Sequence, residues 1–127
     1  NGSHVLKVVR SIYSMPPDHG AAVVSHILNN VELRNLWIKE VDEMRTRVKE
    51  MRHKFVTQMA EKAPSSDFGY IAEQNGMFSY LTLTPEQTQI LIKEHHIYMM
   101  ANGRVNIAGL TLSNMDYVTD AIASLFN

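Results

Sequence analysis

The sequence contains no cysteine among its 127 residues. This absence excludes disulfide scaffolds, cysteine nucleophiles and zinc sites with cysteine ligands. It also agrees with the cytoplasmic location that we expect. No apolar run approaches the roughly 20 residues that a membrane helix needs, and no charged region followed by an apolar one opens the chain. We therefore expect a soluble chain that has no membrane as a partner.

The sequence also lacks an excess of either charge. Twelve basic residues stand against 13 acidic ones, which gives a net charge of −1. Such a balance does not indicate binding to nucleic acid or to an anionic membrane. The six glycines are scattered, so no glycine-rich loop is present to bind phosphate. The length fits one domain that buries about two-thirds of the surface its unfolded chain exposes.

The first residues indicate a boundary near the start of the chain. Asn1–His4 is similar to the remnant of a cleaved expression tag, and we leave it out of the fold; the natural chain is then expected to begin upstream. Residues 5–13 are apolar and short, and Pro16 and Pro17 prevent a helix from continuing. Residues 19–29 have apolar side chains at helical spacing, and Asn30 is suited to cap a following helix.

A long amphipathic helix is the main feature of the sequence. Its apolar residues recur every three or four positions, which predicts a helix of about 33 residues that ends before Pro64. Because strand-like segments follow, we favour a helix packed across a sheet over a coiled coil. The apolar stripe consists of Leu33, Trp37, Val41, Met44, Val48, Met51, Phe55 and Met59.

The second half of the chain predicts two hairpins and two more helices. Asn-Gly pairs at 75–76 and 102–103 lie between apolar runs, and both residue types tolerate positive φ. The expected strand pairs are 68–73 with 77–81 and 97–100 with 105–108.

The two predicted helices have recognisable caps. The first begins at Thr84, where Pro85 and Gln87 complete a capping box, and the second begins at Ser113. The expected class is α+β, with the long helix and shorter helices packed on a small antiparallel or mixed sheet.

Residues that could carry chemistry are few. None of the six histidines has a convincing partner, no serine lies in a nucleophile elbow, and most carboxylates lie on helix faces. A Schiff-base lysine needs an apolar pocket that lowers its pKa, and the six lysines lie mostly on charged helix faces. We predict neither a catalytic residue nor a metal site in this chain. Arg10 and Arg104 lie beside turns, where an arginine is ordinarily solvated.

Three motifs resemble the C-terminal motifs of class I aspartate and aromatic aminotransferases. They are Arg10–Pro17, Gln74–Ser79 and Gly103–Gly109, and they occur in the order and with the spacing of that family. The segment Trp37–Phe55 of the long helix also fits, so the resemblance covers essentially all of residues 5–127.

The resemblance implies roles for three residues. Arg104 would form a bidentate pair with the substrate α-carboxylate, a geometry that suits the planar guanidinium better than a lysine. Arg10 would reach across a homodimer interface to bind the distal carboxylate of a dicarboxylic substrate. Phe78 would lie near the substrate. Residues 5–17 would come from the end of the large domain, and residues 18–127 would form the small domain.

The activity implied for the parent enzyme is transfer of an amino group between an amino acid and a 2-oxo acid, with pyridoxal 5'-phosphate as cofactor. The family's cofactor lysine would lie upstream of Val5. We therefore expect the isolated chain to hold no cofactor and to be inactive. Met15 stands where aspartate-specific members usually carry asparagine, which leaves dicarboxylic and aromatic substrates both open.

A second interpretation remains from the residues alone. The chain could be a free-standing interaction module that binds a partner helix through the apolar stripe of residues 33–59. Its eight methionines suit such a surface, because methionine side chains adapt to many partners.

Overall fold

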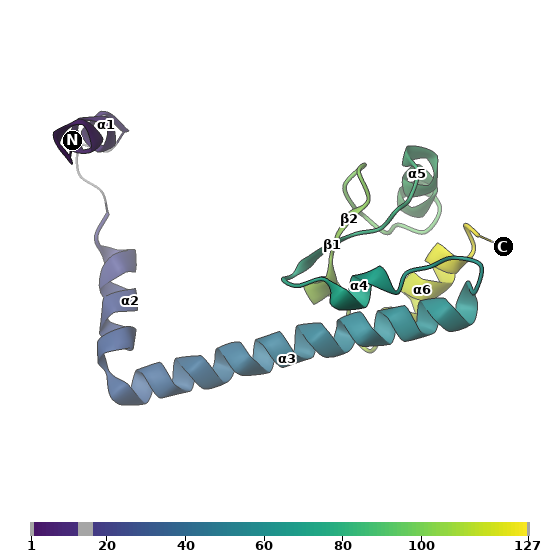
Figure 1. Cartoon of the computed structure of the whole chain (residues 1–127), viewed down its shortest axis with the longest axis horizontal. Helices are drawn as coiled ribbons and strands as arrows, with labels where there is room; N and C mark the ends of the chain where they lie inside the picture. The colour runs from purple at the N-terminus through teal and green to yellow at the C-terminus, as the bar shows by residue number, and fades with distance from the viewer. Residues whose placement is uncertain (1, 13–16, 127) are drawn as a thin grey trace. The chain divides into compact units, whose positions relative to one another are not determined.

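The computed structural model describes residues 2–12 and 17–126, which divide into two compact units between Asp42 and Glu43. The first unit contains α1 (Gly2–Ile12), α2 (His19–Asn29) and the beginning of α3 (Val31–Lys62) (Figure 1). The predicted long helix is confirmed, since α3 ends two residues before Pro64.

Helices α1 and α2 of the first unit bury none of their described side chains. Helix α1 includes residues 2–4, which were expected to be a tag remnant outside the fold. Asn30 caps α3 as predicted, because its Oδ1 accepts a hydrogen bond of 3.0 Å from the Leu33 N–H. Pro16, at the predicted boundary, and Met15, which differs from the asparagine usual in aspartate-specific relatives, lie outside the described residues.

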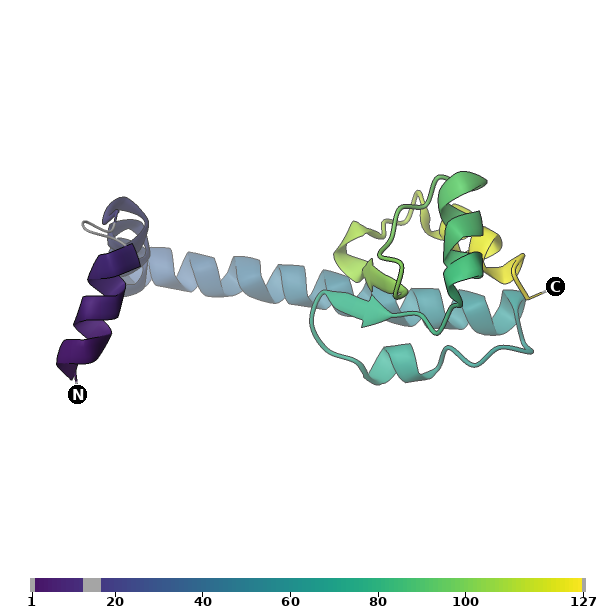
Figure 2. The same ribbon diagram turned by 90° about the horizontal axis from the view of Figure 1, so that it is seen from above.

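The second unit is a small α+β assembly on the C-terminal half of α3, which confirms the expected fold class. Strand β1 (Phe78–Tyr80) pairs antiparallel with β2 (Arg104–Asn106), with Tyr80 opposite Arg104. Figure 2 shows the short helix at 70–73 and the last helix of the chain to either side of α3. The remaining elements of this unit are α4 (Tyr70–Glu73), α5 (Pro85–Lys93), the 3-10 helix η1 (Ile107–Gly109) and α6 (Met115–Ala123).

The hydrophobic core lies in the second unit. Phe55 packs edge to face against Phe68, and Phe68 packs in the same way against Phe126. The buried part of the predicted apolar stripe is Met51, Phe55 and Met59, with Val48 half-buried against them. An interaction module that used the whole stripe is therefore wrong for its C-terminal half, which the chain's own core covers. The part of the stripe that remains exposed is Trp37, Val41 and Met44.

Each predicted hairpin has the right turn residue and one correct strand, 77–81 as β1 and 105–108 in part as β2, but the wrong partner strand. Gly76 and Gly103 adopt φ of 82° and 79°, as the Asn-Gly pairs predicted. Residues 70–73, however, form α4, and β1 pairs with β2 instead. Residues 97–100 form no strand, and their link to β2 is a hydrogen bond of 3.3 Å from the Met100 N–H to the Arg104 carbonyl.

The capping predictions had mixed outcomes. The capping box at Thr84 is present, because Thr84 Oγ1 accepts from the Gln87 N–H and Gln87 Oε1 accepts from the Thr84 N–H. The expected cap at Ser113 is wrong, because α6 begins at Met115 after Asn114. The Asn114 side chain instead accepts a hydrogen bond of 2.7 Å from the Thr111 N–H, which closes the loop before the helix.

Candidate functional site

Arg104 begins β2 directly after a tight turn that only glycine can make. The Gly103 N–H donates to the Met100 carbonyl (2.9 Å), and the Arg104 N–H donates to Asn102 Oδ1 (3.2 Å). A Cβ on Gly103 would lie 2.2 Å from the Leu81 carbonyl oxygen. The close approach of Leu81, which follows β1, and the positive φ together fix the backbone from which the Arg104 side chain extends.

The Arg104 guanidinium lies over the ring of Phe78, with 4.9 Å between its central carbon and the ring centroid. Tyr80 is opposite Arg104 and Phe78 is opposite Asn106, so Arg104 and Phe78 are diagonal neighbours on one face of the sheet. Within the described residues the guanidinium makes no hydrogen bond or ion pair. Its N–H donors are therefore available to a planar anion such as a carboxylate.

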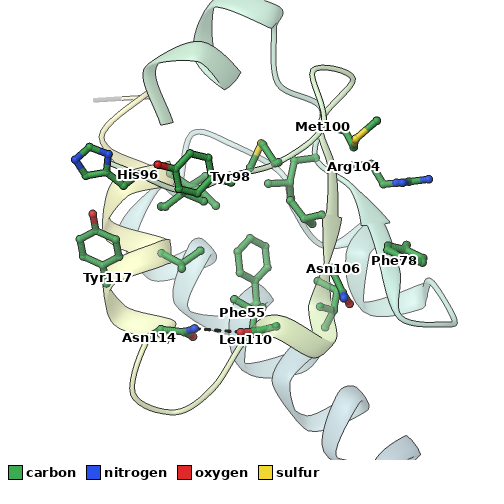
Figure 3. Close-up of a pocket in the computed structure, with 18 residues that line it drawn as sticks. Phe55, Phe78, His96, Tyr98, Met100, Arg104, Asn106, Leu110, Asn114 and Tyr117 are labelled. Carbon is green, nitrogen blue, oxygen red and sulfur yellow. Dashed lines mark hydrogen bonds between the residues drawn. The ribbon is translucent and has the colours of Figure 1, made fainter. Parts of the chain in front are cut away.

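Arg104 and Phe78 lie at one end of a cleft of roughly 640 Å³, and His96 and Tyr117 lie at the other end (Figure 3). The ring of Phe55 lies between the two ends. Most of the remaining lining is apolar, including residues 97–100 and Leu110. An apolar wall beside one cation strengthens the attraction for a single anionic group, because fewer waters compete for it.

A second arginine holds the segment that leads into β1. Arg52 is buried, with 2% of its surface exposed, and Nη1 donates to the Ile71 carbonyl (3.1 Å) and to Ser79 Oγ. Nη2 donates to the Gly76 carbonyl at 2.6 Å. Burial lowers the pKa of the Arg52 guanidinium.

The role of Arg52 was missed by sequence reasoning, although a signal was present. Position 52 lies four residues after Val48 and three before Phe55, so it falls within the apolar stripe of α3. A charged side chain there must be buried and must find hydrogen-bond partners.

Arg47 connects α3 to the segment that follows β2. Its Nη1 donates to the Ala108 carbonyl (3.3 Å), and its Nη2 donates to the Leu110 carbonyl (2.9 Å). Arg47 and Arg52 are thus structural arginines, whereas Arg104 keeps its donors free of protein partners within the described residues. Arg10 is exposed near the end of α1, in the other unit, and its role stays a prediction.

The lining of the cleft does not fit the covalent anchor of pyridoxal phosphate. No lysine is among the described residues that line it. Lys62 is half-buried, but its Nζ pairs with Asp120 at 2.7 Å and donates to Thr119 Oγ1 at 2.9 Å. The described residues contain no group of three or more His, Cys, Asp or Glu arranged to hold a metal ion. No helix in the described ranges is long and apolar enough to cross a membrane.

Comparison with known proteins identifies the family. The family model described as "Aminotransferase class I and II" matches residues 2–122. This chain belongs to that family. The aminotransferase segment is 45% identical to the aspartate aminotransferase of Escherichia coli (strain K12) over 123 residues, which are 97% of this chain and 31% of the relative. It is 39% identical, with the same coverage, to the aromatic-amino-acid aminotransferase of Pseudomonas aeruginosa.

The solved structures agree with this assignment. The aromatic-amino-acid aminotransferase of Burkholderia pseudomallei, solved covalently bound to pyridoxal phosphate, superposes on this aminotransferase segment with a TM-score of 0.92. The two are 40% identical in sequence, and the match covers 98% of this chain and 31% of that one. The segment therefore spans about a third of the length of the relatives that it matches.

Proposed function

We propose that this segment is the C-terminal part of a pyridoxal-phosphate-dependent aminotransferase of the aspartate and aromatic type. The complete enzyme transfers an amino group between an amino acid and a 2-oxo acid. Relatives named as aspartate and as aromatic aminotransferases support the proposal, since both kinds match nearly all of this chain. In that enzyme, residues 18–127 belong to the small domain and residues 5–17 to the end of the large domain.

The proposal rests mainly on the surroundings of the Arg104 guanidinium. Its guanidinium rests on an aromatic ring at one end of an apolar cleft and has no hydrogen-bonding protein partner within the described residues. A substrate α-carboxylate matches the two parallel donors of a guanidinium. Every amino acid and every 2-oxo acid carries such a carboxylate, so one arginine serves both halves of the exchange.

Phe78 and Arg10 complete the proposed substrate contacts. Phe78 covers one face of the Arg104 guanidinium, which limits the directions from which a carboxylate can approach. Arg10 binds the distal carboxylate of aspartate or glutamate in the neighbouring subunit of a homodimer. The choice between dicarboxylic and aromatic substrates then depends on Arg10, whereas Arg104 binds the α-carboxylate that both kinds of substrate carry.

Pyridoxal phosphate supplies the electron sink for this chemistry when it is bound in the complete enzyme. None of the described residues that line the cleft is a lysine, so we assign the anchoring groups to other parts of the enzyme. The contribution of this segment is to bind and orient the substrate. The segment alone is accordingly proposed to be inactive.

The test uses the complete enzyme with Arg104→Ala and Arg104→Lys. A charge-assisted hydrogen bond contributes about 1.5–3 kcal/mol, so Arg104→Ala should lower kcat/KM by at least one to two orders of magnitude for every substrate. Arg104→Lys should recover only part of that loss, because an ammonium group lacks the planar pair of donors. Arg34, an exposed arginine of α3, provides the matched control as Arg34→Ala. Equal activities of Arg104→Ala and Arg34→Ala would refute the proposal.

A further inference from the structure

The hydroxyl of Tyr70 lies against the outer edge of β1. It is 3.0 Å from the Tyr80 carbonyl oxygen, 3.1 Å from the Thr82 nitrogen and 2.8 Å from Thr82 Oγ1. Tyr70 is the first residue of α4, so a helix outside the sheet supplies this contact. Three protein groups therefore converge on one hydroxyl.

One assignment of donors satisfies all of these groups. The Tyr70 O–H donates to the Tyr80 carbonyl, and the Tyr70 oxygen accepts from the Thr82 N–H and the Thr82 hydroxyl. A phenol has one donor and two lone pairs, so its hydrogen-bonding capacity is filled. The Tyr70 hydroxyl thus has no capacity left for a ligand, and its role lies in holding the strand.

Residues 80–82, which bind Tyr70 at one edge, contact the backbone around Arg104 at the other edge. Tyr80 is the cross-strand partner of Arg104, and the Leu81 N–H donates to the Gly103 carbonyl at 2.8 Å. Successive residues of a strand direct their backbone groups to opposite edges. Leu81 therefore bonds inward to the Arg104 turn, while Tyr80 and Thr82 bond outward to Tyr70.

Helix α4 is itself fixed to the scaffold. The buried Arg52 of α3 donates to the Ile71 carbonyl, directly after Tyr70, and to the Gly76 carbonyl before β1. A continuous set of hydrogen bonds therefore runs from α3 through Arg52, α4 and Tyr70 to the strand opposite Arg104. The strand edge would otherwise present unpaired backbone groups and move more freely.

We propose that Tyr70 is a positioning residue whose hydroxyl fixes the β1 edge and thereby sets the geometry with which Arg104 meets the substrate carboxylate. This inference rests on the proposed function of Arg104. Tyr70 does not touch the substrate. It acts through the Tyr80–Arg104 pair, because a bidentate contact loses strength when its donors shift by a fraction of an ångström.

The test compares Tyr70→Phe with Ser124→Ala in the complete enzyme. Ser124 is a matched control, because its hydroxyl also donates to a backbone carbonyl, that of Ala121 at 2.8 Å, but it does not line the cleft. Tyr70→Phe should raise KM about three- to tenfold, for an aromatic amino acid as much as for aspartate, since both present an α-carboxylate. We expect kcat to change less than twofold and the absorbance of the bound cofactor to be unchanged. Ser124→Ala should leave KM within twofold of the wild type.

Thr82→Val provides an independent readout. It removes the hydroxyl that Tyr70 binds but keeps the Thr82 N–H. If the two side chains act as one unit, the Tyr70→Phe/Thr82→Val double variant should raise KM by a factor well below the product of the factors for the two single variants. Multiplicative effects would show that the two residues act separately and would overturn the proposal.

The outcomes separate this inference from the proposed function. If Arg104→Ala has no effect, the proposed function fails, and the role of Tyr70 fails with it. If Arg104→Ala strongly lowers kcat/KM but Tyr70→Phe leaves KM unchanged, as Ser124→Ala does, only the role of Tyr70 is wrong. A Tyr70→Phe variant that loses kcat and cofactor together, with KM unchanged, would show a general structural role and would also overturn the inference.

Discussion

Arg104 and Phe78 lie on different strands, and the guanidinium of one covers the ring of the other at 4.9 Å. The pair is diagonal across the β1–β2 register, so the pairing of the two strands brings these side chains together. Phe78 is 46% exposed, and its ring would otherwise face solvent. The contact orients the guanidinium without using any of its N–H donors.

This contact should be measurable in the isolated chain by a double-mutant cycle. Phe78→Leu removes the ring and Arg104→Met removes the charge, and the cycle should give a coupling free energy of about 0.5–1 kcal/mol, as expected for an exposed cation–π pair. The measurement is urea unfolding followed by circular dichroism. Phe78→Leu combined with Lys54→Met, on an exposed face of α3, is the control and should give a coupling near zero. A coupling as small in the Arg104 cycle would show that the contact is incidental.

The two turns before β1 and β2 show what the sequence could and could not predict. Asn75-Gly76 and Asn102-Gly103 correctly indicated positive φ, because that preference is local. The strand partners were wrong, because Arg52 and Tyr70 hold residues 70–73 as a helix beside β1. Those contacts join residues that are 19 and 10 positions apart, and neither helical periodicity nor a turn motif predicts contacts at such separations.

The glycines of these turns, together with Gly109 of η1, should respond to alanine in a graded way. Gly103→Ala should be the most destabilising, because its Cβ would lie 2.2 Å from the Leu81 carbonyl oxygen in addition to the cost of positive φ. Gly76→Ala has the positive φ but no atom within 4 Å of the new Cβ, so it should cost only the backbone penalty of about 1–2 kcal/mol. Gly109→Ala has neither feature and should be nearly neutral. Equal free energies of unfolding for Gly103→Ala and Gly76→Ala would contradict the close approach of Leu81.

Arg52 illustrates a different limit of sequence reasoning. Its position within the apolar stripe was visible, yet the acceptors it binds come from α4, the turn at Gly76 and β1. Helical periodicity assigns a side chain to a face but does not identify what lies against that face. The candidate site shows the same limit. The family motifs indicated Arg104 and Phe78, but the contact between them depends on the register of the sheet, which the sequence did not predict.

Removal of the Arg52 side chain should therefore destabilise the chain strongly. Arg52→Met leaves the Gly76 carbonyl and Ser79 Oγ without their buried partner, at a cost of about 2–4 kcal/mol. Arg47→Met is the matched control on the same helix: one of the two carbonyl contacts it loses is exposed, so water can replace part of them, and about 1 kcal/mol is expected. Urea unfolding of both variants makes the comparison. An Arg52→Met variant as stable as Arg47→Met would show that the buried guanidinium contributes no more to stability than the partly exposed one of Arg47.

The last prediction concerns Arg10, which the proposal assigns to substrate choice. In the complete enzyme, Arg10→Ala should lower kcat/KM for aspartate and glutamate by about one to two orders of magnitude, because each loses a charge-assisted contact to its second carboxylate. An aromatic amino acid has no second carboxylate, so its kcat/KM should change by less than about threefold. Arg104→Ala should lower kcat/KM for both substrate classes, since both carry an α-carboxylate. Lys7→Ala, which removes another exposed cation from α1, controls for a general loss of positive charge near the substrate. If Arg10→Ala and Arg104→Ala reduced both substrate classes in the same proportion, the two arginines would not have separate roles.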